Sequence, residues 1–373
     1  MTHYFRIGVF CGFLALLIQG FVAEGIFPPY RVGSASMSPV LCGPQVCLTC
    51  PECRFRFRVN EVPDAAEMPE FAVCPRCGLA EVPASRAVGT GGERIFALKT
   101  SRLKRFDLVL FRHPADPAQK AVKRIVGLPG ETVSLENGHL RINGKLCPKP
   151  LAVQLQTRIP LEYGHWESQD GWLVFVPERP VAHTKNLFRK DAAEIPLRSG
   201  VTNERSDNQW MPSLAENTRP VDNLMVDFDC TGAVKLHVFD NGPFTFPAAA
   251  TSHRKLILST FDDTLLLAVD GKVLVNEPIF PPWSGRSPFR IHGEKIRNLT
   301  VYRDLYYTGL PDTDTAVNPP AAVTVPAGCY YVLGDNSRFS EDSRVWEIPF
   351  LPRHHVIGKV ISHKAFFLGN ALP

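Results

Sequence analysis

The sequence predicts a mainly β protein, and two patterns carry this prediction. Short runs of apolar and β-branched residues recur along the chain and are separated by Asp-Gly, Asn-Gly and Pro turns, which is typical of antiparallel strands. The single long apolar stretch lies at the N-terminus, between Ile7 and Phe27. With 373 residues and 45% apolar composition, the chain can build two or three domains with separate cores.

Charge argues against one class of function. The formal net charge is only +4 over 373 residues, and no block of Lys and Arg or repeat of aromatic and basic residues is present. Nucleic-acid-binding proteins concentrate positive charge on one face. We therefore expect no nucleic acid among the partners.

The N-terminal stretch predicts one transmembrane anchor. Residues 7–23 contain a single Gln, and the run reaches Phe27 if Glu24 lies near the interface, which is close to the lower limit of about 17–25 residues for a span. The alternative is a cleaved secretory signal with a small-x-small site at Ala23-Glu24-Gly25. Because the apolar part of a signal is usually about 7–15 residues long, retention is favoured. The predicted location is the cytoplasmic membrane, single-pass, with the N-terminus inside and the bulk of the chain outside.

A short predicted strand, Tyr30–Val32, leads into Ser34-Ala35-Ser36-Met37-Ser38-Pro39. Small polar residues before a proline usually form a turn, which is the simplest interpretation of this segment. An extended chain spans at most about 3.3–3.6 Å per residue. A nucleophile at Ser36 would therefore act close to the membrane surface.

Ten cysteines are present, and six of them fall between Cys42 and Cys77. Four form two Cys-Pro-x-Cys turns, namely Cys50 with Cys53 and Cys74 with Cys77. This spacing is typical of a tetrahedral zinc ribbon. Structural disulfides, which an oxidising compartment favours, or reduced thiols are the alternatives. Four thiolates would complete the zinc coordination, so the predicted role is structural.

Strands are also predicted at 105–112 and 120–126. In the second strand, Lys123 shares a face with Ala121 and Ile125. A solvated lysine on an edge strand is the ordinary alternative. If Lys123 is buried, its pKa falls from about 10.4 toward neutrality, and the amine can then act as a general base.

The remaining segments are predicted as further strands. Two Asn-Gly pairs predict a hairpin over 133–145. Between 147 and 308, short strands with an Asp270-Gly271 turn predict an antiparallel β-sandwich. After a Pro- and Ala-rich connector, a strand at Tyr330–Leu333 enters the polar loop Gly334–Arg344, and a last strand covers 356–361.

A serine becomes nucleophilic only with a base. A Ser-His-Asp triad is conceivable with eleven histidines, but no Gly-x-Ser-x-Gly elbow surrounds Ser36. Lys123 is the lysine best placed to be buried. We therefore interpret Ser36 and Lys123 as a candidate pair.

Four motifs, in this order, resemble those of type I signal peptidases. They cover at most about a quarter of the residues, although the domain that they imply spans most of the chain discontinuously. The motifs are Ser34–Pro39, Arg105–Val109, Lys123–Gly130, and Gly334-Asp335-Asn336 continued by Ser340, Asp342 and Arg344.

This resemblance implies a membrane-bound serine endopeptidase with a signal-peptidase-like β catalytic core on the outer leaflet. It would remove signal peptides from exported preproteins, cutting after small residues at −3 and −1. The resemblance assigns Ser36 as nucleophile and Lys123 as general base, with the Ser36 N–H and the Ser34 hydroxyl as the oxyanion hole. Ser340 would orient the amine. The implied supports of the loop are an Asp342–Arg344 pair and Asp335. No cofactor is implied for catalysis, and the partners are preproteins and the lipid bilayer.

The sequence departs from the family pattern at several positions. Ala35 and Phe106 replace glycines, Val40 stands where Thr is common, and no Pro precedes Ser34. No reacting group is lost, so these departures bear on specificity more than on activity. Two inserts also lie outside the common plan. The larger is similar to a lectin/laminin-G-like jelly roll, and whether it takes a carbohydrate, a protein or no ligand is not predicted.

These observations predict six regions. They are a cytoplasmic tip and anchor (1–27), a first core segment with the nucleophile (28–46), a zinc-ribbon-like insert (47–78), a second core segment with the general base (79–146), a β-sandwich insert (147–308), and a linker with the final core segment (309–373). One alternative function is a surface-tethered binding or scaffold protein that uses the sandwich, with an inert peptidase core. Another is a Ser-Lys peptidase with a narrow substrate, or one that cleaves itself.

Overall fold

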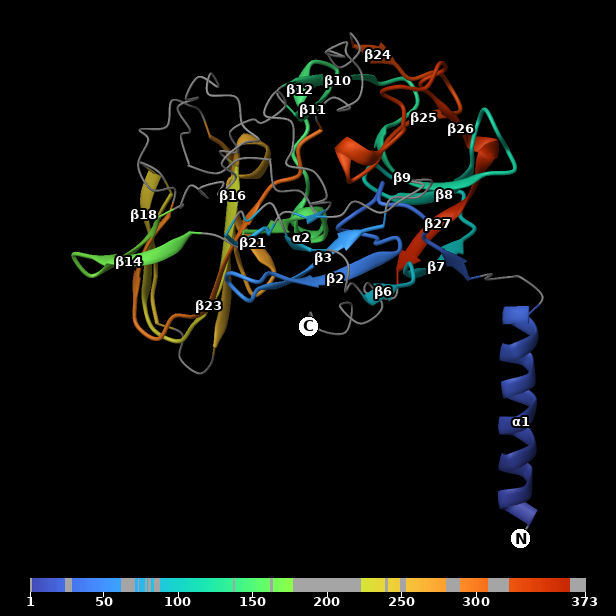
Figure 1. Ribbon diagram of the computed structural model, residues 1–373, viewed down its shortest axis with the longest axis horizontal. Coiled ribbons are helices and arrows are strands. Elements are labelled where there is room, and N and C mark those ends of the chain that lie inside the picture. Colours follow the sequence, from blue (N-terminus) through green and yellow to red (C-terminus); the bar gives the residue numbers. More distant parts are fainter. Residues whose placement is uncertain are drawn as a thin grey trace.

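The computed structural model describes residues 2–23, 29–61, 71–72, 74–77, 79, 82–83, 88–136, 138–161, 164–176, 223–238, 241–248, 253–279, 289–307 and 322–362. Strands dominate these residues, as predicted, and helix α1 (Thr2–Ala23) extends away from them (Figure 1). Short 3-10 turns cover Phe261–Asp263, Ser337–Phe339 and Arg353–His355.

A seven-stranded antiparallel sheet carries the predicted site. Its order is β1 (Tyr30–Arg31), β7 (Arg94–Leu98), β27 (Val356–Ser362), β8 (Leu108–Arg112), β9 (Lys120–Gly127), β25 (Cys329–Leu333) and β26 (Leu351–Pro352). Both faces of β8 are covered. Leu108 and Leu110 pack in one apolar cluster, whereas Val109 and Phe111 pack in another. Neighbouring β9 therefore also lies in an apolar setting.

A smaller sheet continues from the first. Its order is β12 (Lys145–Leu146), β11 (His139–Ile142), β10 (Thr132–Glu136) and β24 (Val323–Thr324). β10 pairs with β11 in antiparallel fashion from Val133 with Ile142 to Glu136 with His139, which confirms the predicted hairpin. Asn143 and Gly144, with φ of 52° and 75°, form the turn from β11 to β12, and Asn137 lies outside the described residues. Val126 and Leu333 share a core with Val133 and Leu140, so the two sheets pack together.

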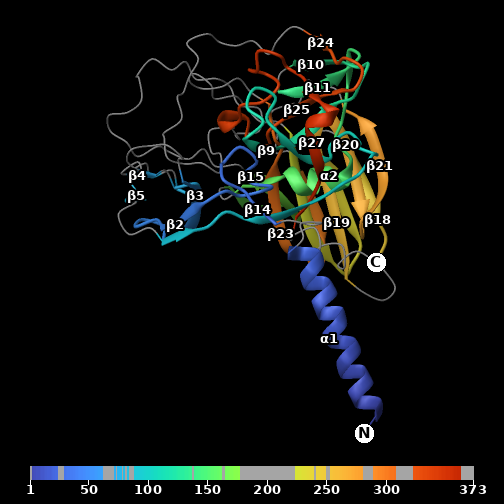
Figure 2. The same ribbon diagram turned by 90° about the vertical axis from the view of Figure 1, so that its right-hand side faces the viewer.

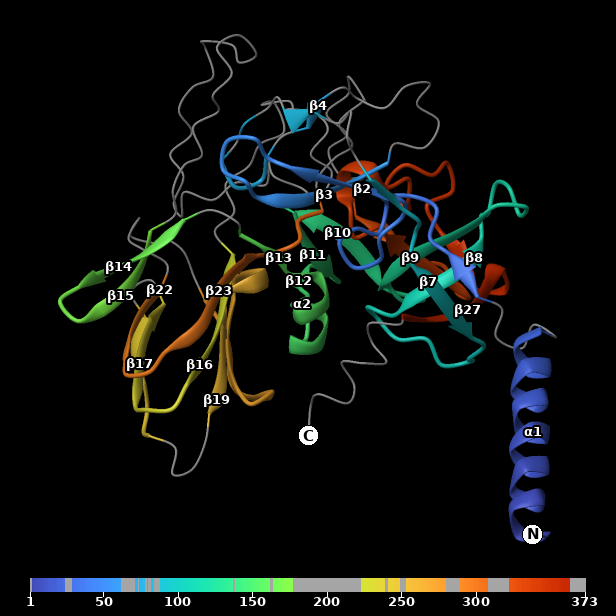
Figure 3. The same ribbon diagram turned by 60° about the horizontal axis from the view of Figure 1, so that its bottom comes forward.

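Two further antiparallel sheets face each other across one core (Figure 3). The first contains β13 (Ile159–Pro160), β23 (Arg297–Arg303), β16 (Leu224–Cys230), β19 (Arg254–Ser259), β20 (Thr264–Val269) and β21 (Lys272–Pro278). The second contains β14 (His165–Gln169), β15 (Trp172–Val176), β22 (Phe289–Gly293), β17 (Val234–Val238) and β18 (Asn241–Phe246). Val226 and Leu258 of the first sheet meet Leu236 and Ile291 of the second. The predicted antiparallel strands are thus present, and the resemblance to a jelly roll stays a prediction.

Helix α2 (Leu151–Thr157) was not predicted. It follows Pro150 and covers the outer face of the six-stranded sheet, because Leu151 and Leu155 pack against the cluster that contains Met225 and Ile257. This helix lies where the chain passes from the smaller sheet to the facing sheets.

The cysteine-rich segment forms two hairpins. β3 (Arg56–Asn60), β2 (Gln45–Thr49) and β6 (Val88–Thr90) make one sheet, and β4 (Phe71–Ala72) pairs with β5 (Val82–Pro83) in another (Figure 2). Their shared core is small and includes Leu48, Val59 and Val82. We call residues 45–90 the ribbon.

No helix in the described residues has both the length and the apolar character that crossing a membrane requires. Residues 24–27 of the predicted anchor lie outside the described residues. The span predicted from the sequence is therefore not confirmed.

Candidate active site

The predicted nucleophile lies in a tight turn after β1. Ser38 N donates to Ala35 O (3.0 Å) and Leu41 N donates to Met37 O (2.9 Å), while Met37 is buried. Ser36 is half-buried, and its hydroxyl accepts a hydrogen bond of 3.2 Å from the exposed Ser34 hydroxyl. The Ser34 hydroxyl can therefore reach a charge that develops beside Ser36.

Lys123 belongs to β9, between β8 and β25, and is only 4% exposed. Burial lowers the pKa of Lys123 to about 8 and outweighs the Asp342 carboxylate, which favours the charged amine. Arg344 adds to the lowering. A neutral amine is thus accessible slightly above neutral pH, which a general base requires.

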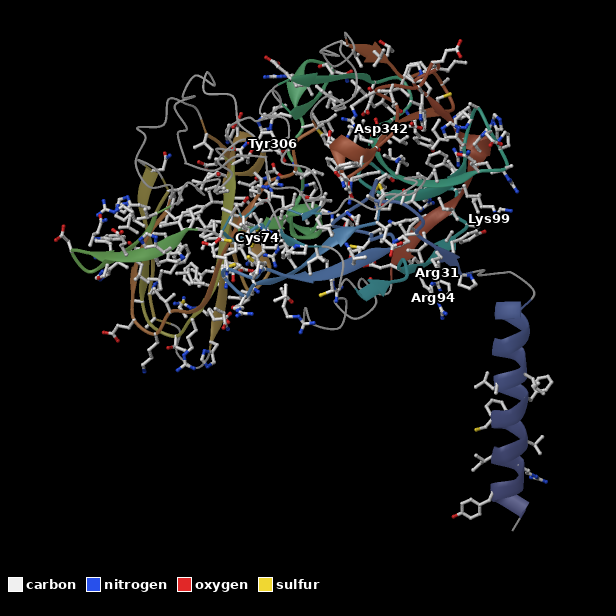
Figure 4. All side chains as sticks on the ribbon, viewed as in Figure 1. Arg31, Cys74, Arg94, Lys99, Tyr306 and Asp342 are labelled. Carbon is white, nitrogen blue, oxygen red and sulfur yellow. The ribbon has the colours of Figure 1, made fainter. Side chains whose placement is uncertain are left out.

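Asp342 organises the loop after β25 and lies among the C-terminal segments (Figure 4). Its carboxylate accepts hydrogen bonds from Gly334 N (2.9 Å), Ser340 Oγ (2.7 Å) and the Arg344 guanidinium (2.8 and 2.9 Å). Burial alone would raise the pKa of Asp342, but Arg344 and these donors hold it below its usual range. Asp342 is therefore charged, and the loop has a fixed shape.

The loop and the nucleophile turn are joined directly. Asn336 donates from its backbone N to Ser36 O (3.0 Å) and from Nδ2 to Ala35 O (3.1 Å). A Cβ on Gly334 would lie 2.6 Å from Ser36 O and would also collide with Ser340 Oγ. The absence of a side chain at Gly334 therefore lets both the Ser36 carbonyl and the Ser340 hydroxyl approach the loop backbone at this point.

The pairing of β9 with β25 brings Lys123 close to the loop that contacts the nucleophile turn. Leu333, the last residue of β25, pairs with Arg124 of β9. Within the described side chains no hydrogen bond links the Lys123 amine to Ser36 or to Ser340. Ser340 directs its proton to Asp342, which leaves its lone pairs as acceptors for an amine. Catalytic hydrogen bonds are often long without substrate and shorten when it binds.

Asp335 contacts a residue for which no role was predicted. Arg124 donates to both Asp335 oxygens (2.7 and 2.6 Å), both side chains are fully buried, and a third bond of 2.9 Å reaches Phe106 O. Strand alternation placed Arg124 on the face opposite to Lys123. A buried arginine needs a carboxylate partner. The sequence pattern could therefore have indicated that Arg124 has an acidic partner, but it could not have identified that partner as Asp335.

The four predicted cysteine ligands come together at the turns of the two ribbon hairpins. The sulfur atoms of Cys50, Cys53, Cys74 and Cys77 all lie within 4.8 Å of one another. Cys50 and Cys77 are 3.6 Å apart, as are Cys53 and Cys74, far beyond a disulfide bond of about 2.05 Å. No disulfide joins any of the ten cysteines, all of which lie among the described residues.

The local backbone suits metal binding. Cys50 N donates to Phe55 O (2.9 Å), and Cys74 N donates to Leu79 O (2.8 Å), so both turns close in the same way. Burial opposes ionisation of these thiols and raises the pKa of Cys74 and Cys77, whereas a hydrogen bond from the Phe55 backbone and contacts with neighbouring thiols lower the pKa of Cys53. Four converging sulfurs are the donor set of a structural zinc site. Cys42 and Cys47 are not in this group.

Comparison with known proteins supports the predicted family. The family described as "Signal peptidase, peptidase S26" matches residues 4–182 and 267–363, which is well over half of the chain. Signal peptidase I of Streptococcus pneumoniae serotype 4 (strain ATCC BAA-334 / TIGR4) is 41% identical over 59 residues, 16% of this chain and 28% of that protein. Signal peptidase I V of Bacillus subtilis (strain 168) is 36% identical over 62 residues, 17% of this chain and 36% of that protein.

The match with these curated relatives thus spans about a third of their length or less. A crystal structure of a signal peptidase I from Enterococcus faecalis V583 is 16% identical, covers 70% of this chain and 98% of that chain, and has a TM-score of 0.21. A score this low does not define a fold. The extent of the family match decides the assignment: the chain belongs to the signal peptidase family, peptidase S26.

Proposed function

We propose that the protein is a serine endopeptidase that removes N-terminal signal peptides from exported preproteins with a Ser36–Lys123 dyad. Cleavage would follow small residues at −3 and −1, as the motifs imply. The observation that carries the proposal is the buried Lys123, whose pKa is lowered to about 8 beside the loop that is hydrogen-bonded to the Ser36 turn.

The proposed reaction has two halves. In the first, neutral Lys123 takes the Ser36 proton while Ser36 Oγ attacks the scissile carbonyl, and the resulting ammonium protonates the leaving amine. In the second, Lys123 removes a proton from water, the hydroxide attacks the ester, and Ser36 regains its proton. The Ser36 N–H and the Ser34 hydroxyl would stabilise the oxyanion in both halves.

A cleavage assay tests the dyad. Detergent-solubilised protein is incubated with a preprotein that carries an Ala-x-Ala site, and product is measured for Ser36→Ala, Lys123→Ala and the control Lys120→Ala. Lys120 is an exposed lysine of the same strand. We expect both dyad variants to be inactive and folded by circular dichroism, and the control to be active. Robust cleavage by Lys123→Ala would reject the dyad.

Several unrelated preproteins in the same assay distinguish a general signal peptidase from a narrow one. Cleavage of most of them supports the proposal. Cleavage of a single substrate, or of the chain itself, would support the narrow Ser-Lys alternative.

Location at the cytoplasmic membrane also stays a proposal, supported by the apolar sequence between Ile7 and Phe27. Fractionation of cells followed by an alkaline carbonate wash tests it. A chain that leaves the membrane fraction in carbonate is not anchored.

We further propose one structural zinc ion at Cys50, Cys53, Cys74 and Cys77, supported by their converging sulfurs. Four thiolates leave no open coordination position, so the ion would take no part in catalysis. Elemental analysis of reduced protein is expected to find one zinc per chain, retained in Cys47→Ser and lost in Cys53→Ser. Reduced wild-type protein without zinc would contradict the site.

A further inference from the structure

The chain enters and leaves the ribbon beside the nucleophile turn. Gly43 lies just before β2, and a Cβ there would be 2.5 Å from Ser34 O. Gly92 lies just after β6, and a Cβ there would collide with Val32 O. Both ends of the ribbon therefore pack backbone to backbone against the segment that leads to Ser36.

Two backbone hydrogen bonds strengthen this contact. Glu93 N donates to Cys42 O, and Val32 N donates to Glu93 O, each at 2.9 Å. The two ends of the ribbon are thus tied to each other and to the strand before the turn.

A buried side chain of the ribbon also holds the turn itself. Asn60, the last residue of β3, is fully buried, and its Oδ1 accepts hydrogen bonds from Ser38 Oγ and Gln45 Nε2, both at 3.0 Å. Ser38 is 1% exposed and follows Ser36 by two positions. Loss of this acceptor would leave buried donors without their partner, so the contact constrains the turn strongly.

The opposite end of the same hairpin carries the thiols. Pairing runs from Gln45 with Asn60 to Thr49 with Arg56, and Cys50 and Cys53 lie in the turn beyond. The ribbon consists of a three-stranded and a two-stranded sheet around a small core, and modules of this size usually need a metal or another cross-link. A link between the two hairpins would therefore stabilise β3 and, with it, the position of Asn60.

We propose that the ribbon positions the catalytic nucleophile, with Asn60 as the positioning residue and metal binding at the four thiols as the condition for it. The proposal rests on the proposed peptidase function and gives the ribbon a role in it. Asn60 does not touch the reacting atoms; it acts through Ser38 on the placement of Ser36.

The first test compares Asn60→Ala, Ser38→Ala and the double variant with the control Arg58→Ala, an exposed residue of the same strand. We expect kcat to fall about 10- to 100-fold, because small misplacements of a nucleophile have effects of this size. KM should change less than about threefold, since substrate contacts are intact. The double variant should be no worse than Asn60→Ala, because Asn60→Ala already removes the hydrogen bond from Ser38, together with the one from Gln45.

Zinc content is measured alongside. If Ser38→Ala has a reduced kcat but still contains one zinc per chain, this supports a role of the ribbon in positioning Ser36. Because Ser38 lies outside the ribbon, this variant remains informative even if Asn60→Ala does not fold. A wild-type kcat in Ser38→Ala or in folded Asn60→Ala overturns the proposal. Arg58→Ala should retain the wild-type kcat, and a loss there equal to that in Asn60→Ala would also overturn it.

The second test does not require cleavage. Hydrogen–deuterium exchange of residues 34–41 is measured in full-length protein before and after zinc is removed with a chelator. We expect zinc removal to increase the exchange rate of residues 34–41 in the wild type. In Asn60→Ala, where the hydrogen bond from Ser38 is already lost, we expect zinc removal to increase the rate only slightly. Unchanged exchange in the wild type overturns the proposal. Failure of the zinc-loaded wild type to cleave any preprotein would instead reject the proposed function.

Discussion

Lys123 shows how a single residue acquires a chemical property from its surroundings. Its face of β9 is apolar, and burial removes the water that would stabilise the ammonium. Asp342 opposes this effect, and Ser340 directs its proton to Asp342. A base with a pKa of about 8 results from this balance.

The pH dependence of cleavage follows from that balance. Below about pH 8 the Lys123 amine carries a proton and cannot accept one from Ser36, so kcat/KM should rise as the pH increases through about 8 and then level off. Rates measured between pH 6 and 10 check this. A flat profile, or activity that falls across this range, would contradict a lysine base.

The ion pair between Arg124 and Asp335 should contribute strongly to stability. Arg124→Met leaves a fully buried carboxylate without its cation, which typically costs about 3–5 kcal/mol. Urea unfolding measures the loss. Arg141→Met is the matched control, because the side chains of its pair with Glu136 are 35% and 57% exposed and exposed pairs contribute about 1 kcal/mol or less. Equal losses in the two variants would contradict this account.

Sequence reasoning reached Lys123 because strand alternation is a local rule. It did not pair Arg124 with Asp335 because the partners are joined only by the packing of β9 against β25. Phe106 is a similar case. It occupies a left-handed conformation with φ of 70°, where a glycine would be unstrained, and its carbonyl accepts from Arg124. The sequence shows that Phe106 stands where the family has a glycine. It does not show that the backbone at this position is left-handed, a conformation that is unfavourable for a residue with a side chain.

Among the elements, the start of α2 is fixed by a buried charge cluster. Lys149 Nζ lies 2.6 Å from Asp262 and 3.1 Å from Asp304, and Lys149 N donates to Asp262 at 2.8 Å. His139 of β11 lies 3.9 Å from Asp262. This cluster connects the smaller sheet with the six-stranded sheet.

Removing the cation should weaken this connection. Lys149→Met leaves two carboxylates buried together, and we expect a loss of about 3–5 kcal/mol in the free energy of unfolding. Lys255→Met is the control, because Lys255 is half-exposed and Asp227 retains Arg158. Calorimetry of both variants measures the difference. A Lys149→Met melting temperature equal to that of the control would contradict a stabilising role.

Elements with strong local signals were predictable. The Asp270-Gly271 turn, with φ of 48° and 79°, connects β20 and β21 as expected. Helix α2 was missed because it has seven residues and follows a proline, so it offers too few turns for a periodic pattern. The polar link from Asn60 to Ser38 was also missed, because no local pattern relates the two residues.

On the scale of the whole molecule, the seven-stranded sheet is assembled from three distant segments. β1 precedes the ribbon, β7 to β9 follow it, and β25 to β27 come from the end of the chain. The facing sheets and the ribbon are excursions from this frame (Figures 1 and 2). Motif order indicated that the core is discontinuous, but strand order depends on long-range pairing that no local pattern encodes.

The position of β27 has a consequence for synthesis. This strand, the last one described, pairs with β7 on one side and with β8 on the other. β7 and β8 are consecutive in sequence, but β27 lies between them in the sheet. Before β27 is synthesised, the centre of the sheet is open, because β7 and β8 lack the strand between them. Under the proposed function, we therefore expect a nascent chain to be without proteolytic activity until β27 has emerged.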